Sequence, residues 1–496
     1  MLKNVKLFML TGVMIFLLIF SFIAAKTGWN FIQLKDPSTA HQILEAQGKS
    51  GNEDFDYAPV EEELVNPTFF SLMRELSDPE YAYGEESYLE AYAGHDARSE
   101  FQKKNFGLHM IAGSACLITG FFQFWPAFRR KNRKIHRVMG VLYVISAFTL
   151  GISSWIYLGN AGFETTFDSL AGNWALYILS STEMLAICIA GFFLLRRQYA
   201  AHMGWMAISL GAFLTAPWQR YDWLMLSWLD TGQTFAMING VVNTVLFTQG
   251  YFTAYWVMVM NRQSSPLNKT YNFEGFSLFA KTSVFSVTAI AVIATFVFYI
   301  GSNGIYGSEL VGQSINFDLW DREQQIILAD FSFLYPLFIT LTLVMTTLSA
   351  YMMLNYRLHD GLAYLLGGVA IVIGLIELNW GVKIGYPTQY LSSGGSHYIG
   401  WSFLHIVFGI LLIAGRYLRW NLLQVEWTMI LWVLSLSMAS LPLIASVSSL
   451  FEVFPKIYVD GGQSAILIVG GIMQGLVIIA IAVATHGPAT KARNVH

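Results

Sequence analysis

The stretch RRKNRKIHRVMGVLYV, residues 129–144, decides the fold, because six of its first nine residues are Lys or Arg while the sequence on both sides is strongly apolar. The whole chain of 496 residues is 55% hydrophobic and only 12% charged. Soluble domains carry roughly a quarter of charged residues, so a soluble chain of this composition could not cover its own surface. We therefore expect an integral membrane protein in which this basic stretch is a turn between two spans.

Twelve apolar runs are long enough to be membrane-spanning helices, each of which needs about 20 mostly apolar residues. They cover residues 5–25, 106–128, 138–158, 173–195, 203–219, 236–259, 279–300, 329–354, 362–382, 399–415, 427–449 and 463–485. The runs do not show the ~10-residue alternating pattern of membrane barrels. The sequence thus predicts an all-α polytopic fold with about twelve transmembrane helices. The first run is expected to be an uncleaved span, because its apolar stretch of about 19 residues is longer than that of a typical signal peptide.

The distribution of basic residues sets the expected orientation, since short cytoplasmic loops collect Lys and Arg. With twelve spans and the N-terminus inside, the inner segments hold 17 Lys or Arg and the short outer loops hold 4. Both termini are therefore expected in the cytoplasm, where anionic lipid headgroups would bind the basic stretch. The lipid bilayer is the expected partner, and the bacterial cytoplasmic (inner) membrane is the expected location.

The loops divide the chain into six predicted segments. These are a first transmembrane helix (1–25), an acidic extracytoplasmic loop (26–105), a five-helix core (106–260), a cytoplasmic linker (261–278), a second six-helix half (279–485) and a cytoplasmic tail (486–496). The acidic loop holds 16 Asp or Glu and 7 Lys or Arg. It is expected to be either a solvated flap or a docking surface for a periplasmic protein partner.

Two stretches suggest that the halves are related to each other. NRKIHRVMGVLYVISAFTLG (132–151) and NYRLHDGLAYLLGGVAIVIG (355–374) share an Asn, a His and a Gly at equivalent positions. Together with a long outer loop after the first and the seventh run, this pattern favours a 6+6 parallel repeat, in which an axis along the membrane normal relates the halves. Chance similarity between charged turns is the alternative.

Residues 106–222 carry motifs of a known family. FQFWPAFRRKNRKIHRVMGVLYV (122–144) and RRQYAAHMGWMAISLGAFLTAPWQR (196–220) resemble an uncharacterised family of predicted bacterial membrane proteins, domain of unknown function 2306. The residues that carry the resemblance are Gln123, His136, Arg137, Gly140, Tyr143, His202, Trp205, Met206 and Arg220, with His109 at the start of the second run. The second half keeps His359 but has Asp360 where Arg would stand. The resemblance implies a membrane protein and supplies candidate residues, but it implies no activity.

One candidate site is a stripe on the second run. His109, Gly113, Cys116, Gly120 and Gln123 are spaced by four, three, four and three residues, which places them on one helical face. Small and polar residues on a membrane helix face other helices or a cavity. The stripe is either a packing seam in which His109 binds a neighbour or the lining of a ligand or proton site.

His136 and His202 open the third and fifth runs and are expected at similar depth near the cytoplasmic boundary. Two such imidazoles could bind a haem b iron from opposite faces, and Arg137 and its basic neighbours could bind the propionates. This layout resembles that of four-helix b-type cytochromes such as the b561 class. Alternatively, these side chains bind phospholipid headgroups, or an anion or nucleotide-like ligand.

Acidic residues inside apolar runs form the third candidate site. Glu183 lies near the middle of the fourth run and Glu377 lies toward the outer end of the ninth. An acid at the centre of a membrane helix costs about 2.5–3.5 kcal/mol on insertion scales, so partners or water must offset it. We expect His109 and His405 to pair with these acids, either as a proton relay or as structural hydrogen bonds.

Three functions from different classes follow from these sites. The first is a b-type haem or quinone-linked membrane redox protein with His136 and His202 as iron ligands and His109 and His405 as a second pair. The second is a proton-coupled small-molecule transporter that uses Glu183 and Glu377. The third is a non-catalytic scaffold that docks a partner through its acidic outer loop. Whether the protein is an enzyme stays open, and the short basic stretch between membrane runs argues against a nucleic-acid partner.

Overall fold

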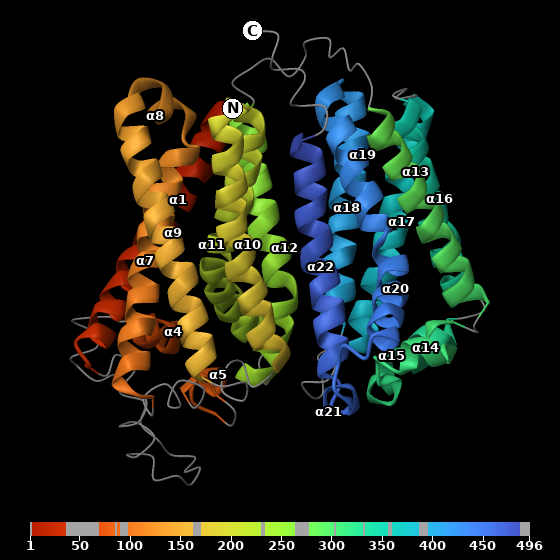
Figure 1. Ribbon diagram of the computed structural model, residues 1–496, viewed down its shortest axis with the longest axis horizontal. Helices are drawn as coiled ribbons and strands as arrows, with labels where there is room; N and C mark the ends of the chain where they lie inside the picture. The colour runs from red at the N-terminus through yellow and green to blue at the C-terminus, as the bar shows by residue number, and fades with distance from the viewer. Residues whose placement is uncertain are drawn as a thin grey trace. The chain divides into compact units, whose positions relative to one another are not determined.

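The structure is a computed structural model in which all described elements are helical (Figure 1). It describes residues 2–35, 69–84, 87–89, 98–161, 170–229, 234–262, 277–301, 304–330, 333–355, 360–385 and 395–486. Most of the predicted acidic loop, including residues 36–68, therefore lies outside the described residues. The predicted tail lies outside them as well, apart from His486.

The chain divides into two compact units. Unit 1 consists of Met1–Cys188 and Ser209–Val257, and unit 2 consists of Ile189–Ile208 and Met258–His496. Unit 1 contains α1 (Leu2–Ile32), α4 (Phe69–Leu76), α5 (Pro79–Tyr83), α7 (Glu100–Phe124), α8 (Pro126–Lys131), α9 (Arg133–Ala161), most of α10 (Leu170–Leu195), most of α11 (Tyr199–Leu229) and nearly all of α12 (Phe235–Arg262).

Unit 2 combines long helices with a set of short ones. The long helices are α13 (Leu278–Thr295), α16 (Leu334–Asn355), α17 (Asp360–Ile384), α18 (Ser396–Tyr417), α19 (Asn421–Ser435), α20 (Ser437–Leu450) and α22 (Gln463–His486). The short ones are η1 (Phe296–Ile300), η2 (Ile305–Gly307), α14 (Glu309–Gly312), η3 (Phe317–Trp320), α15 (Asp321–Ala329) and α21 (Lys456–Asp460). In Figure 1, α14, α15 and α21 lie at the same end of this unit.

Each of the twelve predicted runs overlaps a described helix, but fewer helices qualify as membrane spans. Among the described residues, nine helices are long and apolar enough to cross a membrane. The pair α19 and α20, bent by 42° at a short break, would make a tenth. Helices α11 and α12 are long but are not in this set. They are less apolar than the helices of the set, with polar residues such as His202 in α11 and Asn239 and Gln249 in α12. The count of twelve and the topology therefore stay predictions.

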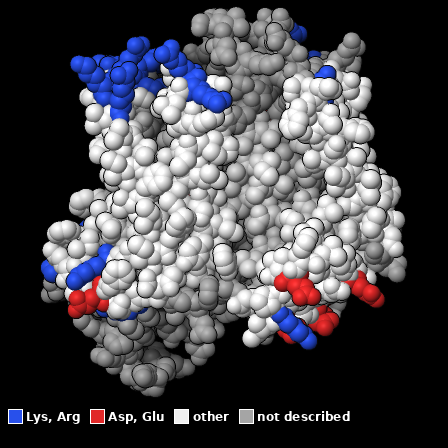
Figure 2. All heavy atoms as spheres, in the orientation of Figure 1, with Lys and Arg blue, Asp and Glu red and all other residues white. Residues whose placement is uncertain are grey.

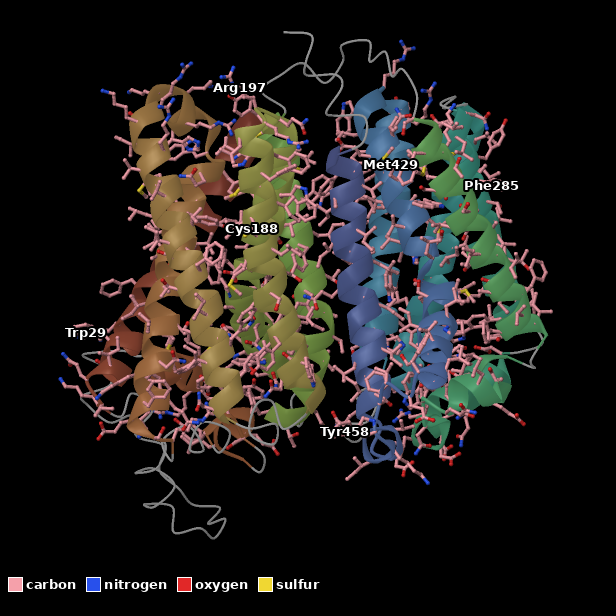
Figure 3. The ribbon with its side chains drawn as sticks, viewed as in Figure 1. Trp29, Cys188, Arg197, Phe285, Met429 and Tyr458 are labelled. Carbon is pink, nitrogen blue, oxygen red and sulfur yellow. The ribbon has the colours of Figure 1, made fainter. Side chains whose placement is uncertain are left out.

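The outer faces of the helices carry apolar side chains that water would solvate poorly. On α13, Phe279 is 82% exposed, Phe285 is 65% exposed and Ile293 is 61% exposed. Figure 3 shows Phe285 pointing away from the helices of unit 2, whereas Met429 on α19 lies within that unit and is fully buried. Exposed apolar area on this scale marks a surface for membrane contact, which supports the assignment as a membrane protein.

On the face drawn in Figure 2, the charged side chains lie at the helix ends. Figure 2 shows Lys and Arg gathered at the end of unit 1 that carries α8, the helix that includes Arg129, Arg130 and Lys131. In unit 2, Asp and Glu gather at the end that carries α14 and α15 (Figure 2). The apolar middle of each unit therefore lies between charged ends, as expected of helices that span a bilayer.

The first helix continues beyond its predicted end at residue 25 and reaches Ile32. Gly28 of α1 packs directly on Gly107 of α7, so that a Cβ added to Gly28 would lie 2.6 Å from the Gly107 carbonyl oxygen. The absence of side chains lets the two backbones touch. This packing stabilises the last turns of α1 within what the sequence predicted to be the start of the outer loop.

Candidate functional site

Helices α17 and α18 pack along a seam of glycines, which brings their backbones into contact. Gly367, Gly374 and Gly381 recur every seven residues on α17. A Cβ added to Gly374 would lie 2.9 Å from the Ser402 carbonyl oxygen, and a Cβ added to Gly367 would lie 2.8 Å from the Gly409 carbonyl oxygen. A seven-residue period keeps one face of a helix along its neighbour. Side chains at the edge of this seam are therefore held close together.

The seam places Glu377 against His405. Glu377 lies between Gly374 and Gly381, and His405 lies between Ser402 and Gly409. The distance from His405 Nδ1 to Glu377 Oε2 is 2.7 Å, and the two residues are only 2% and 4% exposed. The pairing expected from the sequence is therefore present, while its role as a proton relay stays a prediction. His405 Nε2 is buried and has no hydrogen-bond partner among the described residues.

Glu377 also lines a cavity of about 120 Å³ inside unit 2. The segments η1, η2, η3, α15, α16, α17, α18, α20 and α22 all contribute to its wall. Nine of the 20 lining residues are Phe, Tyr or Trp: Tyr299, Tyr306, Phe317, Trp320, Tyr335, Phe338, Trp380, Tyr398 and Trp401. Its titratable side chains besides the tyrosines are Glu323, Glu377 and His397. The described lining thus contains two carboxyl groups and neither Lys nor Arg.

Glu323 is the second buried carboxyl group of this cavity. Its Oε1 accepts hydrogen bonds from the hydroxyls of Tyr306 and Tyr398, at 3.0 and 2.8 Å. Its Oε2 has no hydrogen-bond partner among the described residues, although Glu323 is only 4% exposed. Burial raises the pKa of Glu323 to about 7, and the two tyrosine hydrogen bonds oppose this rise. Glu323 therefore changes its charge near neutral pH.

A proline in α20 helps to fix the cavity wall. Pro442 has no backbone N–H to donate to the carbonyl four residues earlier, which belongs to Met438. The Tyr299 hydroxyl donates a hydrogen bond of 2.8 Å to this Met438 oxygen. Tyr299 belongs to η1, a single π-helical turn of the kind often found at functional sites. The ring of Tyr299 is thereby held at the cavity by a bond between helices.

Aromatic contacts stabilise the remaining wall. The rings of Phe338 and Trp380 meet edge to face with centroids 4.9 Å apart, and Trp380 donates a 2.9 Å hydrogen bond to Asp330 Oδ2. Tyr306 and Phe317 also meet edge to face, at 5.1 Å. Such pairs contribute about 0.5–1.5 kcal/mol each beyond their buried area. The wall is thus a packed aromatic shell around two carboxyl groups.

In unit 1, the stripe on α7 is a packing seam with α9. His109 Nδ1 lies 3.0 Å from Ser154 Oγ, and Gln123 Nε2 donates a 2.9 Å hydrogen bond to the His136 carbonyl oxygen. Cβ atoms added at Gly113 and Gly120 would lie 2.9 and 3.0 Å from side-chain atoms of Leu150 and Tyr143, respectively. Of the two alternatives for this stripe, the geometry favours the seam in which His109 binds a neighbour.

The family-like residues of unit 1 make helix contacts in the same region. The hydroxyls of Tyr143 and Ser209 lie 2.8 Å apart, and both side chains are buried. Gln123 also lies beside Gly140, where an added Cβ would be 3.3 Å from its Oε1. These contacts account for the residue types at three motif positions, Gln123, Gly140 and Tyr143, through helix packing, whereas at His136 the contact is made by the backbone carbonyl oxygen.

The two proposed haem ligands are both half-buried. His136 belongs to unit 1, whereas His202 belongs to unit 2, where its Nδ1 lies 3.0 Å from the Ala190 carbonyl oxygen. Arg137 is exposed. Because the ligands belong to different units, the pairing of His136 and His202 around a haem iron stays a prediction. Among the described residues, no group of three or more His, Cys, Asp or Glu could hold a metal ion.

Glu183 in α10 is only 2% exposed, and its Oε1 has no hydrogen-bond partner among the described residues. The expected pairing with His109 is not observed, because the His109 ring is bound to Ser154 instead. An uncompensated acid in a membrane helix is costly. Glu183 therefore stays a candidate proton-binding group in unit 1.

The sequence did not identify Glu323 or its tyrosine partners. Tyr306, Phe317, Trp320 and Glu323 all lie between two predicted runs, in a segment that was interpreted only as a long outer loop. The loop between these runs holds only three aromatic residues, Tyr306, Phe317 and Trp320, which is no denser than the 15% of the whole chain, so its composition carried no signal. The seven-residue glycine period on α17 is a signal that was available, because it predicts close helix packing around Glu377.

Residues 106–259 match the family model described as "Predicted membrane protein (DUF2306)". This match includes the residues on which the resemblance rested and extends it beyond residue 222 through most of α12. Comparison with curated proteins gave no significant match, and comparison with solved structures gave none either. The matched family is one of membrane proteins, in agreement with the apolar helices, and the cavity of unit 2 lies outside the matched residues.

Proposed function

We propose that this protein is a proton-coupled transporter of a small molecule, with the cavity of unit 2 as its binding site and Glu377 and His405 as its proton-binding pair. The observation that carries the proposal is the contact of 2.7 Å between His405 Nδ1 and Glu377 Oε2, because Glu377 also lines the cavity. A proton gained or lost by this pair changes the charge at the cavity wall. Binding in the cavity and protonation of the pair are therefore coupled.

The cost of burying these groups supports a functional role. Ionisable residues inside membrane helices are expensive and commonly mark proton or substrate pathways. Unit 2 has two buried carboxyl groups, Glu323 and Glu377, in the wall of one cavity. Apolar residues of similar volume would fold at lower cost. Glu183 in unit 1 is the proposed second relay group, as the sequence suggested.

The proposed transporter has a defined membrane and a defined orientation in it. We place it in the bacterial cytoplasmic (inner) membrane, with the basic stretch at 129–137 on the cytoplasmic side and the 26–105 segment outside. The alternatives, a haem b redox protein and a scaffold that docks a periplasmic protein partner through the acidic segment, rest on the sequence alone.

Proton movement in proteoliposomes tests the proposal. The full chain is reconstituted with a pH-sensitive dye inside the vesicles, and three classes of compound are added outside: an alkylammonium ion, a short carboxylate and a neutral amino acid. We expect at least one class to cause a proton flux that Glu377→Gln abolishes. The matched control is Glu309→Gln, which neutralises an exposed acid of α14 outside the cavity lining.

A result in which none of the three classes moves protons faster than in protein-free vesicles would overturn the proposal. The same holds if Glu377→Gln and Glu309→Gln give equal fluxes, because the pair would then have no part in the coupling.

A further inference from the structure

The charge and shape of the unit 2 cavity define the class of molecule that it accepts. Its described lining carries two buried carboxyl groups and neither Lys nor Arg. Glu377 is paired with His405, whereas the hydrogen-bond partners of Glu323 are two tyrosine hydroxyls. One carboxylate oxygen, Oε2 of Glu323, has no hydrogen-bond partner among the described residues. A carboxylate held this way in a buried site is compensated best by a positive charge.

The aromatic wall adds a second preference for a cation. The face of a Trp, Tyr or Phe ring attracts a cation within about 6 Å of its centroid, most strongly when the site is desolvated. Trp320, Trp380 and Trp401 line the cavity together with four tyrosines and two phenylalanines. Trp320 is only 5% exposed, and its Nε1 has no hydrogen-bond partner among the described residues. Aromatic cages of this composition recognise substituted ammonium ions.

The chemistry of the wall argues against an inorganic cation. Hard metal ions take about six or more oxygen ligands, whereas most of this lining is carbon. The described residues also contain no cluster of three or more acidic, His or Cys side chains placed to hold a metal. The cavity volume of about 120 Å³ is slightly smaller than the ~150 Å³ cavities that accept benzene. This volume fits a compact organic ion with few non-hydrogen atoms.

We infer that the cavity of unit 2 binds a small organic monocation of the substituted ammonium class, with Glu323 as its counter-charge and the Tyr and Trp rings as its cage. This inference rests on the proposed function, because it names the class of molecule that the transporter carries. Tyr306 and Tyr398 hold Oε1 of Glu323, whereas Oε2 is buried and has no hydrogen-bond partner among the described residues.

The pH dependence of binding follows from the same geometry. A cation favours the carboxylate form, so binding and protonation at Glu323 compete. The pKa of Glu323 is about 7 in the absence of a cation, and binding should therefore weaken as the pH falls through neutrality. The other titratable side chains of the cavity wall are Tyr299, Tyr306, Tyr335, Glu377, His397 and Tyr398.

Equilibrium binding to the purified full chain tests the inference without any transport step. Tetramethylammonium is titrated calorimetrically into the protein in detergent at pH 8, and tert-butanol, a neutral molecule of the same tetrahedral shape, is titrated in parallel. We expect tetramethylammonium to bind and tert-butanol to bind much more weakly. Glu323→Gln should raise the Kd for tetramethylammonium by about tenfold or more, as expected when a desolvated cation loses its buried counter-charge, and Glu309→Gln should leave it unchanged.

Two further measurements keep the test decisive if Glu323→Gln fails to fold. The wild-type protein should bind tetramethylammonium more weakly at pH 5 than at pH 8, which needs no variant. Trp320→Leu should weaken binding, whereas Trp320→Phe should retain part of it, because Phe keeps an aromatic face.

Three outcomes would overturn the inference: no binding of tetramethylammonium, equal binding of tert-butanol, or displacement of tetramethylammonium by potassium at equal concentration. The binding assay and the flux assay can fail independently of each other.

A proton flux driven by the carboxylate, without tetramethylammonium binding, would reject the ammonium site and keep the transporter. Tetramethylammonium binding that depends on Glu323, without proton flux for any compound, would keep the site and reject the transporter.

Discussion

His405 of α18 and Glu377 of α17 are joined by a 2.7 Å contact that is almost completely shielded from solvent. Removing one partner of a buried hydrogen-bonded pair leaves the other group unsatisfied and costs about 1–3 kcal/mol. His405→Leu should therefore lower the thermal midpoint of the purified protein strongly. Glu377→Gln should lower it less, because the amide oxygen still accepts a hydrogen bond from the imidazole. Equal thermal midpoints for His405→Leu and wild type would show that the pair does not stabilise the fold.

The glycine seam between α17 and α18 predicts opposite effects on stability for alanine substitutions at two glycines of α17. Gly374→Ala should destabilise the protein by about 1–3 kcal/mol, the typical cost of overpacking, because its Cβ would lie 2.9 Å from the Ser402 carbonyl oxygen. Gly368→Ala is the matched control, since nothing lies within 4 Å of its added Cβ. It should stabilise α17 by up to about 1 kcal/mol through helix propensity. Thermal unfolding in detergent measures both, and a Gly374→Ala variant as stable as Gly368→Ala would contradict the seam.

The raised pKa of Glu323 predicts a pH dependence of stability. Burial raises this pKa from 4.5 to about 7 in the folded protein. The folded state therefore binds the Glu323 proton more tightly than the unfolded state does. The free energy that this proton contributes to folding is present in full below about pH 4.5 and is lost as the pH rises through about 7. The shift between the two pKa values corresponds to about 3 kcal/mol of folding free energy, at 1.36 kcal/mol per pKa unit. The thermal midpoint of the ligand-free wild type should fall between pH 5 and pH 8, and this slope should be smaller in Glu323→Gln. An identical slope in both proteins would assign the effect to another group.

The haem hypothesis makes a separate spectroscopic prediction. If His136 and His202 bind a haem b iron, the purified protein shows a Soret band and yields haem in a pyridine assay. His136→Ala and His202→Ala should then each lose the band, while His109→Ala, whose ring is bound to Ser154, should keep it. A colourless preparation from haem-supplemented cells would reject the hypothesis.

The predicted topology can be tested by labelling single cysteines. After replacement of Cys116 and Cys188, cysteines at Arg130 and Tyr417 should react with an impermeant thiol reagent only in permeabilised cells. A cysteine at Lys456 should react in intact cells. All three positions are exposed or lie in exposed segments. Labelling of Arg130→Cys and Tyr417→Cys on opposite sides of the membrane would contradict the twelve-span arrangement.

The helices and the membrane character could be predicted because both depend on local sequence. A spanning helix needs only a consecutive run of apolar residues, and each of the twelve runs overlaps a described helix. The pairing of Glu377 with His405 was also predictable, because two membrane residues that are costly alone reduce that cost by pairing. The end of α1 was not predictable from its apolar run, since the packing of Gly28 on Gly107 extends the helix to Ile32.

The sequence alone determined that this chain is helical, apolar and membrane-bound, with its few buried acids as the residues of interest. Only the tertiary structure decided that Glu377 shares a cavity with Glu323, an acid that the sequence had not identified. Glu323 and Tyr398 are 75 residues apart and meet at 2.8 Å, and Tyr306 reaches the same carboxylate from a different segment. The physical reason is that hydrophobicity acts on each helix separately, whereas a cavity depends on which helix faces meet. Close glycine contacts and interhelical hydrogen bonds set those faces, and no local run of residues encodes them.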